Sequence, residues 1–296
     1  MDPTAPEGTV AWSALLAEAT ERVGANDARR IVEEVTGADP GRLHRVLDEL
    51  ATERGVARFD AMVARRVAGE PLQYVLGRWG FRSLDLMVDR RVLIPRPETE
   101  VVAGLAIEAL SSKAVPSRIH DVSRDLLVAD LGTGSGAIGL AIAVECPTAR
   151  VMATDASTDA LAVARANLAG VGRAATRVSL HEGSWYSALP PAVEGSLDLI
   201  VSNPPYVADG EELPPVVGEW EPPTALRAGA TGLDDLRRLV DDAPRWLAAE
   251  GVLVLEMAPD QTDTVAGWAE ALRLRATIHP DLTGRPRAVV ARKNAE

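Results

Sequence analysis

The segment LLVADLGTGSGAIGLAIAV, residues 126–144, places a glycine-rich loop between two apolar runs. The first run ends at Asp130 and predicts a buried strand, and the second predicts a helix. Gly132, Gly134 and Gly136 occupy every second position of the loop, where the missing Cβ lets the backbone turn sharply and approach a ligand. Because ligands of open α/β sheets bind at the carboxyl edge of the strands, the loop predicts a binding site at that edge.

From this segment onward, apolar runs of strand length alternate with segments of helical periodicity. We expect strands at 126–131, 150–154, 176–181, 197–202, 251–257, 274–279 and 286–292. We expect helices at 135–145, 157–170, 232–249 and 260–272. The alternation predicts a Rossmann-like α/β sheet, mostly parallel, with helices on both faces. Only PDLTGRP separates the last two strands, which are therefore expected to form an antiparallel hairpin.

The part of the chain before the glycine loop has other patterns. Apolar residues recur at helical spacing between 10 and 70, which predicts a small bundle of short helices. The period changes at 79–95, which predicts a β-hairpin, and Pro97 with two nearby glutamates predicts the start of a helix. A polar loop is expected at 111–124. The predicted parts are a small helical domain at 1–75, a linking β-hairpin at 76–95 and a sheet domain at 96–296.

The composition is that of a folded, acidic protein, with 47% hydrophobic residues and a formal net charge of −12 over 296 residues. An acidic chain argues against a general grip on nucleic acid, which needs clustered Lys and Arg. Cys146 is the single cysteine, so no disulfide can form within the chain, which fits a reducing cytosol. We expect no signal peptide, no membrane span and no metal site, because the N-terminus lacks a basic and an apolar region, no apolar run is long enough and the histidines are far apart.

Asp155 closes the strand that follows the glycine loop. A carboxylate there can accept hydrogen bonds from both hydroxyls of a ribose, so the loop and the acid together predict a nucleoside pocket. Two cofactors fit. GSGAIG, residues 134–139, matches the dinucleotide fingerprint, whereas DLGTGSG, residues 130–136, matches the loop of S-adenosylmethionine-dependent methyltransferases. The acidic Asp130 before the glycines favours the methyl donor.

A second pattern, NPPY at 203–206, follows the fourth strand of this sheet and by the same edge rule faces the glycine loop. The Asn203 side-chain carbonyl and the Pro204 backbone carbonyl are acceptors, Pro205 fixes the turn, and Tyr206 offers a flat ring. Two acceptors and a stacking face match a planar –NH2 group. Holding both hydrogens favours a pyramidal nitrogen whose lone pair points at a methyl group, so we assign catalysis to Asn203, Pro204 and Tyr206.

With these motifs the chain resembles the HemK/PrmC family, the protein-(glutamine-N5) methyltransferases of peptide chain release factors. The resemblance covers most of the chain and includes GEPLQYVLGRWGF (69–81), LIPRPETE (93–100), DLGTGSGAIGLA (130–141), NPPY (203–206) and EPPTAL (221–226). It implies transfer of a methyl group from S-adenosylmethionine to the glutamine amide of the Gly-Gly-Gln motif of class-1 release factors, with S-adenosylhomocysteine as product. It also implies that the helical domain recognises the body of the release factor, a role that the segment alone leaves open against that of a stabilising cap.

The family's site residues carry over to matching positions of this chain. The resemblance implies that the cofactor is held by Gly132, Thr133, Gly134, Ser135, Gly136, Asp155, Trp185 and Asn203. It implies that the substrate glutamine is bound by Asn203, Pro204, Pro205 and Tyr206, with Arg96 near the mouth of the site. Two places depart from the family: Ser184 stands where an acid is usual, and Met257 and Ala258 follow Glu256 where His or Ile and then Gly are common. We expect a cytoplasmic monomer that uses no metal and binds neither nucleic acid directly nor a membrane.

Three other functions remain open on the sequence. A nucleic-acid amino-methyltransferase would present adenine N6 or guanine N2 to the same NPPY residues, but the acidic charge disfavours it. An NAD(P)-dependent oxidoreductase would use GSGAIG and leave NPPY without a purpose. In a non-catalytic binding module, the N-terminal helices would do the work.

Overall fold

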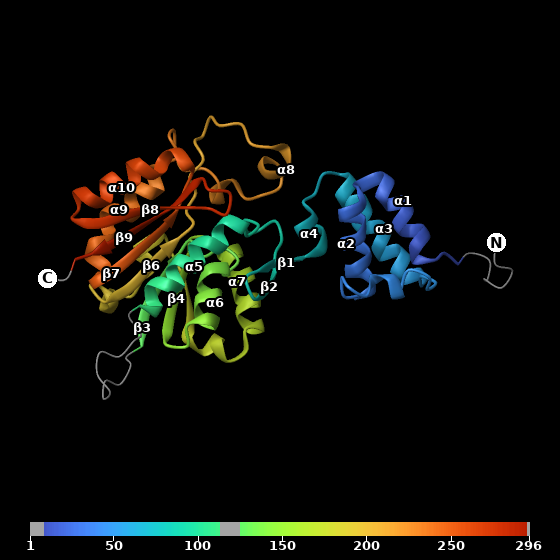
Figure 1. Cartoon of the computed structure of the whole chain (residues 1–296), viewed down its shortest axis with the longest axis horizontal. Helices are drawn as coiled ribbons and strands as arrows, with labels where there is room; N and C mark the ends of the chain where they lie inside the picture. The colour runs from blue at the N-terminus through green and yellow to red at the C-terminus, as the bar shows by residue number, and fades with distance from the viewer. Residues whose placement is uncertain (1–8, 113–124, 295–296) are drawn as a thin grey trace. The chain divides into compact units, whose positions relative to one another are not determined.

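The computed structural model describes residues 9–112 and 125–294 (Figure 1). Its internal contacts divide the chain into two compact units, Met1–Arg78 and Trp79–Glu296. The extreme N-terminus and most of the polar loop expected at 111–124 lie outside the described residues. No helix in the described ranges is both long and apolar enough to cross a membrane.

The first unit is helical, as predicted. Its helices are α1 (Trp12–Val23), α2 (Ala25–Thr36), α3 (Glu53–Val67) and α4 (Leu72–Leu76), with a 3-10 turn at Leu43–Arg45. Gly24 separates the first two helices with a φ of 85°, which a residue with a side chain rarely adopts. Trp12 packs edge-on against Phe59 with ring centroids 6.0 Å apart, and an Arg66–Asp27 ion pair of 2.6 Å joins α3 to α2. These contacts join the helices of this unit into one bundle.

The second unit is built on a seven-stranded sheet with the spatial order β5-β4-β3-β6-β7-β9-β8 (Figure 1). The strands are β3 (Leu126–Leu131), β4 (Ala149–Asp155), β5 (Val178–Glu182), β6 (Leu197–Ser202), β7 (Leu247–Glu256), β8 (Leu274–Pro280) and β9 (Pro286–Lys293). Strands β3 to β7 pair in parallel, and β9 lies antiparallel to both β7 and β8. The predicted α/β sheet with its C-terminal antiparallel hairpin is confirmed.

Helices cover this sheet, with α5 packed beside α6 and α9 beside α10 (Figure 1). Their bounds are α5 (Pro97–Ser111), α6 (Ala137–Glu145), α7 (Thr158–Gly170), α9 (Asp234–Trp246) and α10 (Thr262–Ala271), and α8 (Pro215–Gly218) is one short turn. The small hairpin consists of β1 (Arg78–Phe81) and β2 (Leu84–Met87). Because β4 and β6 flank β3 on opposite sides, the strand order reverses between β3 and β6. Loops that follow these two strands meet at that edge, which is where such sheets bind ligands.

The boundary between α9 and β7 differs from the sequence prediction. The helix expected at 232–249 ends at Trp246, and β7 begins at Leu247 rather than at residue 251. Pro244 lies in the last turn of α9, where it has no N–H to donate. Leu247 is fully buried and pairs with Leu197 of β6, so strand pairing takes over where the helix weakens.

Candidate active site

A buried acid, Asp130, stabilises the glycine loop after β3. Gly132, Gly134 and Gly136 have φ values of 73°, 56° and 87°, so the loop turns through a region that favours glycine. Asp130 Oδ2 accepts hydrogen bonds from the Thr133 hydroxyl at 2.5 Å and from the Gly139 amide at 2.8 Å. Burial raises the pKa of Asp130 to about 6. The role of this carboxylate is therefore to shape the loop, and it is not part of the cavity wall.

Asp155, at the end of β4, faces the glycine loop from the side. Its Oδ2 accepts a hydrogen bond from the Gly134 amide at 2.9 Å, and its Oδ1 accepts one from the Ser157 amide at 2.9 Å. Burial raises the pKa of this carboxyl, and backbone donors at Ser157, Gly134 and Ala156 oppose that rise. Each oxygen keeps a lone pair for a further donor, so Asp155 can accept hydrogen bonds from a diol in the cavity.

Trp185 lies over the glycine loop in a strained backbone conformation. Its φ is 49°, which is rare for a bulky residue. The indole Nε1 donates a hydrogen bond of 3.1 Å to Asp235 Oδ1, a partner that the sequence did not suggest. A Cβ placed on Gly132 would lie 3.1 Å from the indole ring, so a side chain there would push the ring away from the loop. Strain of this kind is frequent at binding sites.

The NPPY segment follows β6, and its successive residues face opposite sides of the chain. Asn203 and Pro205 line the cavity, whereas Pro204 is buried and the Tyr206 ring packs against the apolar core. In an extended chain successive side chains point to opposite sides, which accounts for this order. Burial raises the pKa of Tyr206 to about 12, and its carbonyl accepts a 2.9 Å hydrogen bond from Gln261 Nε2. The flat face expected from Tyr206 is thus not on the wall of this cavity.

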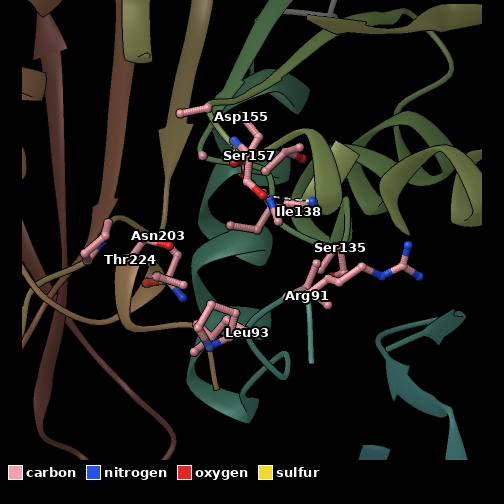
Figure 2. A pocket seen from close by; sticks show the side chains of 18 of the residues that line it. Arg91, Leu93, Ser135, Ile138, Asp155, Ser157, Asn203 and Thr224 are labelled. Carbon is pink, nitrogen blue, oxygen red and sulfur yellow. Dashed lines mark hydrogen bonds between the residues drawn. The ribbon is translucent and has the colours of Figure 1, made fainter. Parts of the chain in front are cut away.

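The glycine loop, Asp155, Trp185 and Asn203 border one cavity of about 480 Å³ (Figure 2). Figure 2 shows Asp155 and Ser157 on one side of it and Asn203 with Thr224 on another. The predicted site residues on its wall are Gly132, Thr133, Gly134, Ser135, Asp155, Trp185, Asn203 and Pro205. The predicted site residues that are not on it are Gly136, Pro204, Tyr206 and Arg96. Ser184, one of the two departures from the family pattern, also lines the cavity.

Arg96 joins two of the quoted motifs instead of lining the cavity. Its guanidinium forms an ion pair with Glu221, whose side chain is buried. The other carboxyl oxygen of Glu221 accepts a hydrogen bond from the Ile94 amide at 3.1 Å. Because Pro95 on one motif and Pro222 on the other both line the cavity, this ion pair holds two parts of its wall together.

The sequence patterns did not predict contacts between residues far apart in the chain. Thr99 lies in the quoted LIPRPETE motif without an assigned role, yet it lines the cavity and accepts a hydrogen bond from Asn203 Nδ2 at 3.1 Å. Asp235 and Glu221 were also unassigned. Within the described ranges, no three His, Cys, Asp or Glu side chains are grouped so that they could hold a metal ion.

Comparison with known proteins places the chain in a family. Residues 10–77 match the PrmC N-terminal domain family, and residues 112–219 match the methyltransferase small domain family. The chain is 41% identical to the release factor glutamine methyltransferase of Streptomyces coelicolor, over 94% of this chain and 96% of that protein. It is 37% identical to that of Mycolicibacterium smegmatis, over 99% of this chain and 98% of that protein.

Among solved structures, the hMettl16 catalytic domain in complex with MAT2A 3'UTR hairpin 6 matches with a TM-score of 0.54. The match covers 83% of both chains at 12% identity, which is a likeness of fold alone. The near full-length sequence similarity is the stronger finding. This chain belongs to the PrmC/HemK family of release factor glutamine methyltransferases.

Proposed function

We propose that this protein transfers a methyl group from S-adenosylmethionine to the side-chain amide nitrogen of the glutamine in the Gly-Gly-Gln motif of class-1 release factors. The similarity to release factor glutamine methyltransferases over almost the whole chain supports this activity. The main structural observation in its support is that Asn203 lines the same cavity as Gly132 and Asp155. A group held by Asn203 therefore lies beside a ligand held by the glycine loop.

The residues of the cavity fit S-adenosylmethionine. The Gly132–Ser135 backbone allows close approach, Asp155 offers acceptors for a ribose diol, and Trp185 offers an aromatic face. Asp155 and Asp235 give this wall a negative charge that suits a sulfonium cation. When bound, this cofactor supplies an electrophilic methyl group, and its sulfur keeps the electron pair of the broken carbon–sulfur bond, leaving S-adenosylhomocysteine.

Asn203, which lines the cavity, is proposed to orient the substrate nitrogen together with the backbone carbonyl of Pro204, whose role rests on the family resemblance because Pro204 does not line the cavity. Because Asn203 Nδ2 is engaged with Thr99, its Oδ1 is the end of the amide that remains for the substrate. Oδ1 and the Pro204 carbonyl then accept the two amide hydrogens, which turns the nitrogen lone pair toward the methyl group. Such positioning of reacting atoms at about 3–3.5 Å is worth several kcal/mol of the barrier. The nitrogen forms the new bond to carbon and afterwards releases one proton to water.

A labelling experiment tests the proposed function. The protein is mixed with cofactor labelled on its methyl group, a class-1 release factor, and tRNA or rRNA. Label is expected on the release factor and should disappear when the Gly-Gly-Gln glutamine is replaced by alanine. Label only on the RNA would contradict the proposal and favour a nucleic-acid amino-methyltransferase.

The helical domain at 1–75 is proposed to bind the body of the release factor, its match to the PrmC N-terminal domain family being the support. The sheet unit has its own core, so its cofactor site should survive loss of this domain. Deleting residues 1–75 should weaken release factor affinity by at least about tenfold, while affinity for S-adenosylmethionine stays within about twofold. Both affinities are measured by calorimetry. An unchanged affinity for the release factor would refute the recognition role. We further propose that the protein works in the cytoplasm, because a release factor is its substrate. We also propose that it is a monomer and needs no metal.

A further inference from the structure

Thr99 and Glu256 lie near Asn203, and the mechanism above uses Thr99 only as the partner of Asn203 Nδ2 and does not use Glu256. Strands β6 and β7 pair in parallel with Ser202 opposite Leu255. Asn203 directly follows β6 and Glu256 is the last residue of β7, so both lie at the carboxyl edge of neighbouring strands. Helix α5 packs against both strands and carries Thr99 in its first turn. Three distant parts of the chain thus bring an amide, a hydroxyl and a carboxyl together.

The three side chains form a hydrogen-bonded series. Asn203 Nδ2 donates to Thr99 Oγ1 at 3.1 Å, and the Thr99 hydroxyl acts on the Glu256 carboxyl as a hydrogen-bond donor that lowers its pKa. Thr99 is 4% exposed and Glu256 is 1% exposed, so water does not compete for these bonds. The second carboxyl oxygen of Glu256 has no hydrogen-bond partner among the described residues. A buried carboxyl with a spare acceptor favours a neighbour that donates to it.

The number of protons in this series decides which end of Asn203 faces the cavity. A hydroxyl has one proton to donate, and an ionised carboxylate only accepts. The Thr99 proton therefore goes to Glu256, and Thr99 Oγ1 must accept from Asn203 Nδ2. In the reverse arrangement, Asn203 would present N–H groups to a substrate –NH2 group, which is also a donor.

We propose that Thr99 and Glu256 are positioning residues that fix the orientation of the Asn203 amide so that its carbonyl oxygen faces the substrate. This inference rests on the proposed function, because it assigns the polarity with which a glutamine amide is recognised. It predicts a defect in turnover without a matching loss of cofactor affinity, since neither residue holds the glycine loop.

Burial and the surrounding charged groups together set the pKa of Glu256. Burial raises its pKa to about 7, and the Thr99 hydrogen bond opposes that rise. Arg287 on β9 and Arg96 before α5 lower this pKa, and Glu98 on α5 raises it. The charge of Glu256 also raises the pKa of the partly buried Tyr206 phenol. As the pH falls through about 7, the carboxyl gains a proton that it can donate to Thr99, which permits the reverse arrangement and should lower turnover.

Two variants of Thr99 test the inference, with wild-type protein methylating the release factor as the reference. Thr99→Val keeps the branched shape without the hydroxyl and should lower kcat at least about tenfold, since misplacing a reacting group costs up to about 100-fold. Thr99→Ser keeps the hydroxyl and should stay within about threefold of wild type, and calorimetry should give both variants wild-type affinity for S-adenosylmethionine. A Thr99→Val enzyme with wild-type kcat, or a Thr99→Ser enzyme as slow as Thr99→Val, would overturn the inference. A wild-type protein without activity would instead count against the proposed function.

Glu256→Gln tests the second half of the series. Its kcat should no longer depend on pH near 7, where the wild type loses rate on the acid side. Protonation of Asp130, with a pKa of about 6, would act through the glycine loop and is recognised by a change in cofactor affinity. The same pH step in kcat in Glu256→Gln and in wild type would exclude Glu256 from the role proposed here.

Discussion

Replacing Asn203 by alanine should lower kcat by about 100-fold or more, because a single positioned acceptor at a reacting centre is worth that much. The variant loses the Oδ1 acceptor for the substrate amide and leaves the Thr99 hydroxyl without its donor. The substrate nitrogen would then keep its planar geometry and point its lone pair less often at the methyl group. Single-turnover labelling of a release factor measures the effect on the chemical step.

Asn294→Ala serves as the matched control for this variant. Asn294 is exposed in the sheet unit, and its amide nitrogen donates a hydrogen bond to the Arg273 carbonyl at 3.0 Å. The control should keep the wild-type rate. Calorimetry with S-adenosylmethionine should show a much smaller loss for Asn203→Ala than the loss in kcat. An Asn203→Ala enzyme that turns over at the wild-type rate would show that this amide does not orient the substrate.

Replacing Asp155 by alanine should weaken affinity for the cofactor by about 100-fold, since hydrogen bonds to a charged group contribute about 1.5–3 kcal/mol each. The variant loses an acceptor for the ribose hydroxyls and the two bonds that hold the Gly134 and Ser157 amides. The glycine loop would lose its lateral support as well as its ligand contact. Calorimetric titration with S-adenosylhomocysteine measures the change.

Asp159→Ala is the control for this prediction, because Asp159 is an exposed acid in the first turn of the helix that follows Asp155. It removes the same charge from the same region and should leave cofactor affinity within about twofold of wild type, as exposed charges contribute little. Equal affinities for Asp155→Ala and wild type would mean that the cofactor is not held at this carboxylate.

Local patterns were sufficient to predict most of the fold. The glycine loop, the strand and helix alternation and the missing helix between β8 and β9 each depend on neighbouring residues, and each prediction is confirmed. The insertion of β9 between β7 and β8 was not predicted, because strand order depends on pairing between distant segments. The end of α9 was misplaced for a similar reason, since Leu247 pairs with Leu197, which lies far earlier in the chain.

The site also has features that local patterns predict and contacts that they do not. Asp155 and Asn203 follow strands whose carboxyl ends meet, so the edge rule alone predicts that they share a cavity, as they do. Thr99 and Asn203 are 104 residues apart, and Trp185 and Asp235 are 50 apart, so no local pattern reveals those contacts. The Tyr206 ring faces the core because the extended chain after Asn203 alternates, a direction that a motif of residue types does not specify.

Mass spectrometry of class-1 release factors, isolated from cells with and without this protein, tests the proposed function most directly. The Gly-Gly-Gln peptide should carry one added methyl group on its glutamine amide when the protein is present and none when it is absent. A glutamine that is methylated to the same extent in both, or in neither, would contradict the assignment of this protein as its methyltransferase.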